Sequence, residues 1–192
     1  MIESIKNLDR KIFFLINSHH HTRIDYAMFW MSNELIWIPF YMVLTGMIIY
    51  FFRKKSWVVI PSLLLLFTAS DQLSGLIKNS VRRFRPCHNE SFGHLVHIIK
   101  NCGGQYGFVS SHAANTFALA TFITLLMKGK YEYIGWLLFL WAAVISYSRI
   151  YLGVHYPADV AGGALLGILL GVGVYRINKW VIAKVFPEPV LG

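Results

Sequence analysis

Charged residues are scarce in this sequence. Asp, Glu, Lys and Arg together make up only 14% of the 192 residues, whereas 56% are hydrophobic and 16% are aromatic. This composition excludes an ordinary soluble domain, which carries about 25% charged residues. We therefore predict an integral membrane protein.

Acidic residues are the scarcer kind. Nine Asp and Glu stand against 18 Lys and Arg, which gives a formal net charge of +9. A nucleic-acid-binding protein gathers such an excess on one face, but here the basic residues are dispersed at the ends of apolar runs. Anionic lipid of the bilayer is the partner that this pattern predicts, and no nucleic-acid partner is expected.

Cysteine is almost absent. Cys87 and Cys102 are the only two, and both lie in one long polar connection. They can form a disulfide if that connection faces an oxidising compartment, and otherwise they remain reduced thiols. The sequence leaves both states open.

Long apolar runs, in contrast, are abundant. A helix needs about 20 apolar residues to cross about 30 Å of hydrocarbon. Five runs approach this length, namely residues 35–52, 57–77, 113–127, 133–147 and 158–175. A shorter apolar piece precedes the first of them, which lies too deep in the chain to be a cleaved signal peptide. The fold class that we predict is all-α, a polytopic bundle of five to six membrane helices in one domain over residues 1–192.

The N-terminal residues 1–22 are too charged to span a membrane. Apolar side chains such as Ile5 and Leu8 alternate there with charged ones such as Lys6 and Asp9. An amphipathic helix of this kind lies in the membrane interface. We predict an interfacial N-terminal helix.

Basic residues predict the orientation of the spans. Arg53, Lys54 and Lys55 follow the first span, and counting spans places Lys128, Lys130 and the C-terminal basic residues on the same side. The positive-inside rule makes that side cytoplasmic. The long polar connection, residues 79–110, is then an extracytoplasmic loop of a protein in the cytoplasmic membrane. Its own basic residues count against this orientation unless they bind anions, which is our interpretation of them.

Two polar clusters flank this loop. Lys78 and Arg85 have six residues between them in a basic stretch, and together they can contact several oxygens of one phosphate. Ser110 is expected to cap the third span, and the free N–H groups after it attract anions beside His112. Asp71, in the second span, is expected to turn toward other helices, because lipid contact is costly for a carboxylate.

A third cluster, residues 148–159, joins the last two spans and contains Arg149, His155 and Asp159. Pro157 suits the first turn of the next helix, because it has no N–H to lose there. A neutral imidazole is a nucleophile toward phosphorus, and a carboxylate on its other nitrogen fixes the tautomer. The helix that follows carries glycines at four-residue spacing, a stripe that lets a neighbouring helix approach closely.

Together these motifs resemble the three-part signature of the type 2 phosphatidic acid phosphatase (PAP2) superfamily. That signature is Lys-x6-Arg-Pro, then Pro-Ser-Gly-His, then Ser-Arg-x5-His-x3-Asp. The matching residues here are Lys78, Arg85, Pro86, Ser110, His112, Ser148, Arg149, His155 and Asp159, in the same order. The superfamily includes lipid phosphate phosphatases and vanadium haloperoxidases, but the haloperoxidases are large and soluble, so the spans argue against them.

The resemblance implies a metal-independent phosphatase that needs no cofactor. His155 would form a phosphohistidine, Asp159 would support it, and His112 would act first as an acid and then as a base. The groups implied to bind the substrate phosphate are Lys78, Arg85, Ser110, Arg149 and the Ser111 amide. Two positions depart from the signature: Val109 replaces proline and Ser111 replaces glycine. The added side chain at Ser111 could narrow the pocket or alter the turn.

The function that we predict is hydrolysis of a phosphomonoester or diphosphate on a membrane lipid. Undecaprenyl diphosphate is the favoured substrate, and Arg82, Arg83 and Lys100 could hold its second phosphate or anchor to lipid headgroups. Phosphatidylglycerophosphate and lipid A are the alternatives within this reaction class. A protein of a different class, which binds or transports phosphate lipids without cleaving them, is the reading that the altered second motif favours.

Overall fold

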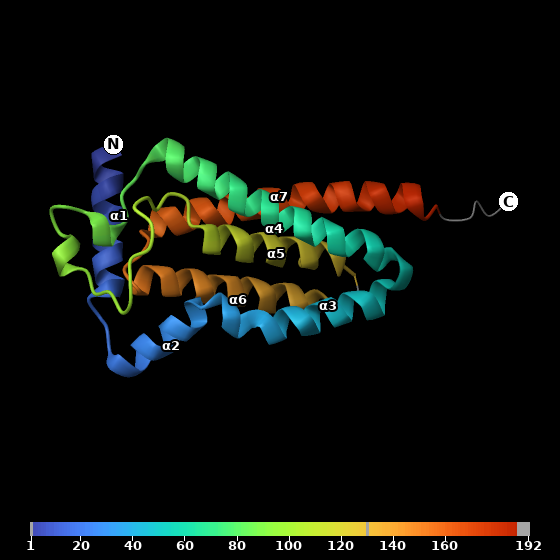
Figure 1. Cartoon of the computed structure of the whole chain (residues 1–192), viewed down its shortest axis with the longest axis horizontal. Coiled ribbons are helices and arrows are strands. Elements are labelled where there is room, and N and C mark those ends of the chain that lie inside the picture. The colour runs from blue at the N-terminus through green and yellow to red at the C-terminus, as the bar shows by residue number, and fades with distance from the viewer. Residues whose placement is uncertain (1, 130, 188–192) are drawn as a thin grey trace.

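The structure is a computed structural model and describes residues 2–129 and 131–187. Its α-helices are α1 (Ile2–Asn17), α2 (Thr22–Ser32), α3 (Ile38–Phe52), α4 (Ser56–Val81), α5 (Ser111–Leu126), α6 (Glu132–Tyr151) and α7 (Pro157–Val185). Short 3₁₀ turns cover Glu34–Trp37, Arg53–Lys55, Pro86–His88 and Gly93–Leu95. Helices α2 to α7 run along the long axis of the molecule, and α1 lies across one end (Figure 1). The prediction of an all-α bundle is confirmed.

Three segments of the described chain are long and apolar enough to cross a membrane. They are Glu34–Val81, which contains both α3 and α4, Tyr133–Tyr151 in α6, and Pro157–Val185 in α7. The predicted boundaries were close, except that α7 continues about ten residues beyond the predicted span. The chain is a multi-pass membrane protein.

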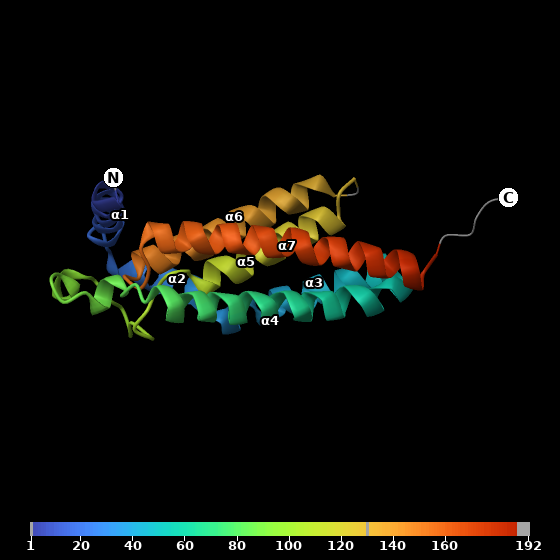
Figure 2. The ribbon, with the colours of Figure 1, turned by 90° about the horizontal axis from the view of Figure 1, so that it is seen from above.

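Helix α5 differs from the predicted spans. With 16 residues it is only about 24 Å long, and it lies between α4 and α6 in both views of the bundle (Figures 1 and 2). Its side chains Leu119, Phe122 and Ile123 are buried in the main hydrophobic core. Because other helices surround α5, it does not need the length that contact with lipid demands of a spanning helix.

Helix α7 packs against α5 through the predicted glycine stripe. A Cβ atom at Gly163 would lie 2.4 Å from the carbonyl oxygen of Ser110, and one at Gly167 would lie 2.3 Å from that of Ala114. Only glycine permits backbones to approach so closely. The contact matters for the site, because it fixes the start of α7 against the start of α5.

Helix α1 has two faces with different surroundings. Phe13 is fully buried and packs with Phe92 and Tyr156, which belong to the polar connection and to the residues before α7. On the opposite face, Ile5 and Leu8 are about 60% exposed. The amphipathic pattern is therefore real, but the helix also packs tightly against the end of the bundle, which the sequence did not predict.

The two ends of the bundle carry different connections. The α3–α4 connection with Arg53, Lys54 and Lys55 lies at the same end as the C-terminal part of α7 (Figure 1). The polar connection between α4 and α5 and the connection between α6 and α7 lie at the opposite end. This arrangement agrees with the predicted counting of spans. Lys130, on which the orientation argument also relied, lies outside the described residues.

Candidate active site

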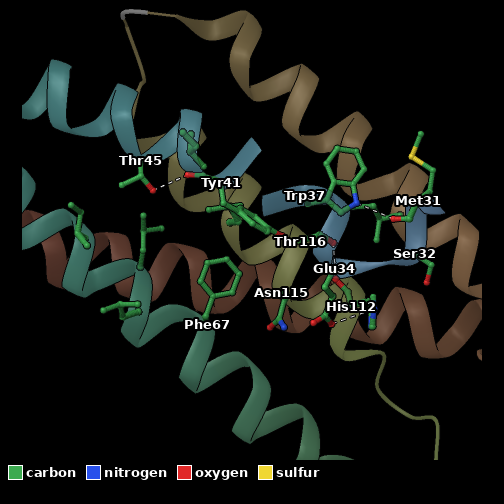
Figure 3. Close-up of a pocket in the computed structure, with 16 residues that line it drawn as sticks. Met31, Ser32, Glu34, Trp37, Tyr41, Thr45, Phe67, His112, Asn115 and Thr116 are labelled. Carbon is green, nitrogen blue, oxygen red and sulfur yellow. Dashed lines mark hydrogen bonds and ion pairs between the residues drawn. The ribbon is translucent and has the colours of Figure 1, made fainter. Parts of the chain in front are cut away.

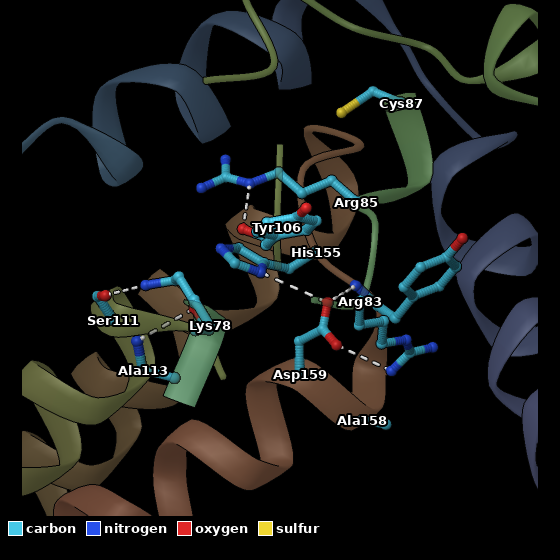
Figure 4. Close-up of polar contacts among 12 residues, drawn as sticks. Lys78, Arg83, Arg85, Cys87, Tyr106, Ser111, Ala113, His155, Ala158 and Asp159 are labelled. Carbon is cyan, nitrogen blue, oxygen red and sulfur yellow. Dashed lines mark hydrogen bonds and ion pairs between the residues drawn. The ribbon is translucent and has the colours of Figure 1, made fainter. Parts of the chain in front are cut away.

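The three predicted clusters meet at the end of the bundle where α1 lies (Figure 4). They are contributed by the last turn of α4, the connection after it, the first turn of α5, the last turn of α6 and the start of α7. The predicted site residues in these positions are Lys78, Arg85, Ser110, Ser111, His112, Arg149, His155 and Asp159. The described chain thus brings all eight to one region.

His155 and Asp159 are held by the start of α7. Asp159 is fully buried, and its Oδ2 accepts a hydrogen bond of 3.0 Å from the backbone N–H of Tyr156, which caps the helix. The same oxygen lies 3.5 Å from Nδ1 of His155, which is at the outer limit for a hydrogen bond. The other edge of the imidazole ring faces the side of the site where Lys78 and Ser111 lie (Figure 4).

The environment of His155 keeps its imidazole neutral. The ring is only 2% exposed, and burial lowers the pKa of His155 to about 4, with Arg149 and Arg85 adding to the effect and Asp159 opposing it. Burial disfavours the charged form of any histidine. At neutral pH, an Nδ1–H directed at Asp159 leaves the lone pair on Nε2, which is the form required of a nucleophile.

Three cations converge beside this ring. Arg85 is fixed by the carbonyl oxygens of Cys102, at 2.6 Å, and Tyr106, at 3.2 Å. Arg149 donates to Ser32 through Nη1, while its buried Nε has no protein partner in the described chain. Lys78 interacts electrostatically with both arginines. A buried N–H without a protein partner and three positive charges in one region form a site for an anion with several oxygens.

The start of α5 adds backbone donors to this region. Ser110 is buried and caps the helix, as predicted, because its hydroxyl accepts from the N–H of Ala113 at 3.5 Å. Its own N–H donates to the carbonyl oxygen of Asp159 at 2.9 Å. This bond joins the second motif directly to the third. The positive end of the α5 dipole therefore lies next to the cations.

The side chain of Ser111, where the signature has glycine, contacts α4. Its hydroxyl accepts a hydrogen bond from the Lys78 ammonium and lies 2.7 Å from the hydroxyl of Ser74. The extra side chain is therefore accommodated by a polar partner and holds Lys78. The other departure, Val109, is a buried apolar residue that packs against α7 near Gly162.

We expect Ser111→Ala to weaken phosphate binding about fivefold, because the Lys78 ammonium loses a charge-assisted hydrogen bond that fixes its position. The measurement is the inhibition constant of inorganic phosphate in a hydrolysis assay. Ser80→Ala is the matched control, since Ser80 is exposed on α4 and bonds only within its own helix. An unchanged inhibition constant in Ser111→Ala would show that this hydroxyl does not support the anion site.

Arg83 and Asp9 support Asp159 and the start of α7 through contacts that the sequence did not reveal. Arg83 binds Oδ1 of Asp159 at 2.8 Å and Oδ2 of Asp9 at 2.5 Å, and its guanidinium lies over the ring of Tyr156. Asp9 also accepts from the N–H of Ala158 at 2.8 Å. Arg83 was predicted to bind a second phosphate or a lipid headgroup, but the structure commits it to these carboxylates. Helix α1 thereby braces the start of α7.

Asp9→Asn should lower both stability and turnover. The half-buried Arg83 loses one of two carboxylates, so we expect a loss of about 1–2 kcal/mol in unfolding free energy. Because Asp159 loses part of its support, we expect turnover at saturating substrate to fall by up to about tenfold. Glu3→Gln, on an exposed turn of the same helix, is the control. Thermal unfolding and initial rates well below the melting temperature separate the two effects, and wild-type values of both would contradict this role for α1.

A cleft of about 400 Å³ opens beside His112 (Figure 3). Most of its wall is apolar and comes from α3, α4 and α5, with Tyr41, Phe67 and Leu119 among the lining residues. Glu34 stands at the polar part of the wall, with Oε1 at 3.4 Å from Nε2 of His112. The sequence pointed to no role for Glu34, because it precedes the first span by a single residue and looks like an ordinary flanking charge.

The side chain of Asp71, which was predicted to turn toward other helices, is exposed on α4 and not buried among them. Its charge still interacts with Lys78, which lies about two turns along the helix. The residues of α4 that line the cleft, Ile60, Leu63 and Phe67, precede Asp71 at helical spacing. Asp71 therefore continues the cleft-facing side of α4, where it is spared full contact with lipid.

The two cysteines are joined in a disulfide, with their Cα atoms 6.2 Å apart. The bridge resolves the alternative that the sequence left open and fixes the loop whose Cys102 carbonyl binds Arg85. Within the described ranges, Cys87, His88 and Cys102 are the only group with the residue types and spacing to hold a metal ion. Because both thiols are used in the bridge, this group offers one histidine nitrogen, which is too little for a structural metal site.

Comparison with known proteins agrees with this arrangement. The model of the PAP2 superfamily matches residues 57–183. A lipid A 4'-phosphatase of Bacteroides thetaiotaomicron is 34% identical over 197 residues, which covers 100% of this chain and 87% of the relative. The crystal structure of Aquifex aeolicus LpxE superposes with a TM-score of 0.69 at 28% identity, covering 88% of this chain and 95% of the other.

The same comparisons do not favour the predicted preference for undecaprenyl diphosphate. An undecaprenyl-diphosphatase of Sulfolobus acidocaldarius is 29% identical over 160 residues, which covers 82% of this chain and 72% of the relative. The lipid A alternative has the stronger likeness. Membership of the family does not depend on which lipid is cleaved. The chain belongs to the PAP2 superfamily and is a membrane-embedded phosphatase that acts on lipid phosphate esters.

Proposed function

We propose that this phosphatase removes a phosphate monoester from a glucosamine-based lipid of the lipid A type, at the extracytoplasmic face of the cytoplasmic membrane. The observation that carries the proposal is the 34% identity to a lipid A 4'-phosphatase along the whole of this chain. That length includes α1 and its Asp9, which brace the candidate nucleophile through Arg83 and Asp159.

The first chemical step is attack on phosphorus. Lys78, Arg85, Arg149 and the N–H groups at the start of α5 hold the phosphate oxygens and cancel their charge. Nε2 of His155 forms a bond to phosphorus, and the bond between phosphorus and the leaving oxygen breaks. His112 gives a proton to that oxygen. Asp159 stabilises the positive charge that develops on the imidazole.

The second step releases the phosphate. His112, now neutral, takes a proton from a water molecule, whose oxygen attacks the phosphohistidine. The bond between phosphorus and Nε2 of His155 breaks, which restores the neutral imidazole and produces inorganic phosphate. The chain's own side chains supply every proton transfer in this sequence, so the proposed mechanism uses no metal ion.

The cleft beside His112 suits the rest of the lipid. Acyl chains fit its apolar wall, and the phosphate then lies next to His112, which is at the polar end of the same cleft. The exposed apolar face of α1, which lies across the bundle, suits a membrane interface at this end (Figure 1). The basic residues at the opposite end support a cytoplasmic location for that end.

The test is phosphate release by the purified protein in detergent with a chelator present. The panel is lipid A, phosphatidylglycerophosphate, phosphatidic acid and undecaprenyl diphosphate, and His155→Ala is the control. Histidine-dependent release that is fastest from lipid A supports the proposal. Faster release from undecaprenyl diphosphate would return the assignment to the first prediction, and binding without release from any lipid would favour a non-catalytic protein.

A further inference from the structure

Glu34 is a carboxylate at a position where the substrate carries negative charge. It stands at the first position of the 3₁₀ turn before α3, where Asn33 caps the turn by accepting from the N–H of Leu35 at 3.0 Å. Its side chain is 78% exposed, yet its Oε1 lies 3.4 Å from Nε2 of His112. A carboxylate at this place repels a phosphate and weakens substrate binding, so we expect the residue to have a role in the reaction.

The position of Glu34 relates it to the leaving group. In the proposed function, on which this inference rests, His112 protonates the leaving oxygen, so the group that His112 contacts lies on the leaving-group side. Glu34 and His112 line the same cleft, which also takes the lipid tail (Figure 3). The cations Lys78, Arg85 and Arg149 surround the transferred phosphate. The charge of Glu34 also interacts with Arg149, but its carboxylate is in contact with His112. Glu34 therefore borders the leaving group more closely than it borders the phosphate that is transferred.

We propose that Glu34 determines specificity by favouring an alcohol as the leaving group over a lipid monophosphate. In a phosphomonoester the bond from phosphorus to a neutral alcohol oxygen breaks, whereas in a diphosphate the departing group is itself an anionic phosphate. A carboxylate beside the leaving group repels the second kind and not the first. Glu34 thus makes the chain a monoesterase.

The contact with His112 works in the same direction. An alcohol is a poor leaving group and needs a proton as the bond to phosphorus breaks. Burial and the neighbouring cations lower the pKa of His112, and a carboxylate 3.4 Å from its Nε2 acts against them by favouring the imidazolium form that supplies the proton. A lipid monophosphate leaves readily without a proton. Removing the charge of Glu34 should therefore slow the monoester reaction while it relieves repulsion in the diphosphate reaction.

A matched pair of substrates isolates this effect. Dodecyl phosphate and dodecyl diphosphate share a tail and differ in the leaving group, and initial rates of phosphate release give kcat/KM for each. In Glu34→Gln, we expect the ratio of diphosphate to monoester kcat/KM to rise about tenfold. The change is no larger because Glu34 is exposed and solvent screens its charge. Glu34→Asp, which keeps the charge, should retain most of the wild-type ratio. Glu90→Gln is the control, because Glu90 is an exposed carboxylate of the polar connection that does not line the cleft.

The outcome is distinguishable from a failure of the proposed function. If His155→Ala abolishes release but Glu34→Gln leaves the ratio unchanged, or lowers both rates equally, Glu34 does not select the leaving group and the phosphatase mechanism stands. As a second measurement, higher ionic strength should raise the ratio in the wild-type protein relative to the ratio in Glu34→Gln, because salt screens the repulsion by Glu34 only in the wild type and screens the attraction by the cations in both. A salt effect of equal size in both proteins would also overturn the inference.

Discussion

Replacing His155 by alanine is expected to reduce phosphate release from any lipid phosphate by at least about 10⁴-fold, because loss of a nucleophile removes the covalent route entirely. The remaining cations can still bind phosphate, so affinity for inorganic phosphate should change much less than turnover. The measurement is initial-rate phosphate release, with thermal unfolding to verify the fold. Turnover at the wild-type level in this variant would refute the assigned nucleophile.

A second experiment makes the covalent step visible. In His112→Asn, a substrate with a good leaving group such as p-nitrophenyl phosphate still phosphorylates His155, but the water that should attack the intermediate loses its base. We expect a burst of nitrophenol followed by slow turnover, and phosphate on the protein that survives alkali and is lost in acid. Combining this change with His155→Ala should remove both the burst and the bound phosphate.

The location of the site could be predicted because helix ends follow from apolar runs. Lys78 and His112 bound the connection between α4 and α5, whereas Arg149 and His155 bound the connection between α6 and α7. Two helices, α5 and α6, separate the connections, so the chain returns to the same end. The spacing of four residues between His155 and Asp159 is also local, which is why the pair could be recognised from sequence.

The residues that the sequence did not reveal act over long separations. Asp9 reaches Arg83 across 74 positions and Ala158 across 149 positions, and neither contact has a periodic signal in the chain. Glu34 meets His112 only because the α2–α3 junction packs beside the start of α5. Hydropathy likewise cannot show that neighbouring helices cover α5, since a buried helix and a lipid-facing helix have the same composition.

The close packing of α7 against α5 connects the fold with the site. It fixes Asp159, in the first turn of α7, against Ser110, which caps α5. Gly167 is the tightest point of this contact, because a Cβ there would lie 2.3 Å from the carbonyl oxygen of Ala114 and 2.8 Å from the N–H nitrogen of Ala118. Both neighbours are backbone atoms of a helix, so they cannot move aside as a flexible side chain would.

Gly167→Leu should therefore destabilise the protein by more than the roughly 1–3 kcal/mol typical of overpacking, and should abolish activity in the molecules that remain folded. Gly173→Leu is the matched control: it lies in the same helix, and an added Cβ there meets nothing within 4 Å, so stability and turnover should stay near wild type. Thermal unfolding in detergent and initial rates test both variants. Equal stability of the two would mean that α5 and α7 tolerate separation, and the site would then have to be held together mainly by Arg83 and the disulfide-closed loop. Full activity in a destabilised Gly167→Leu protein would show that catalysis does not depend on the close contact between α5 and α7. The hydrogen bond from Ser110 to Asp159 could not survive a displaced α7, so its loss would then have no effect on the site.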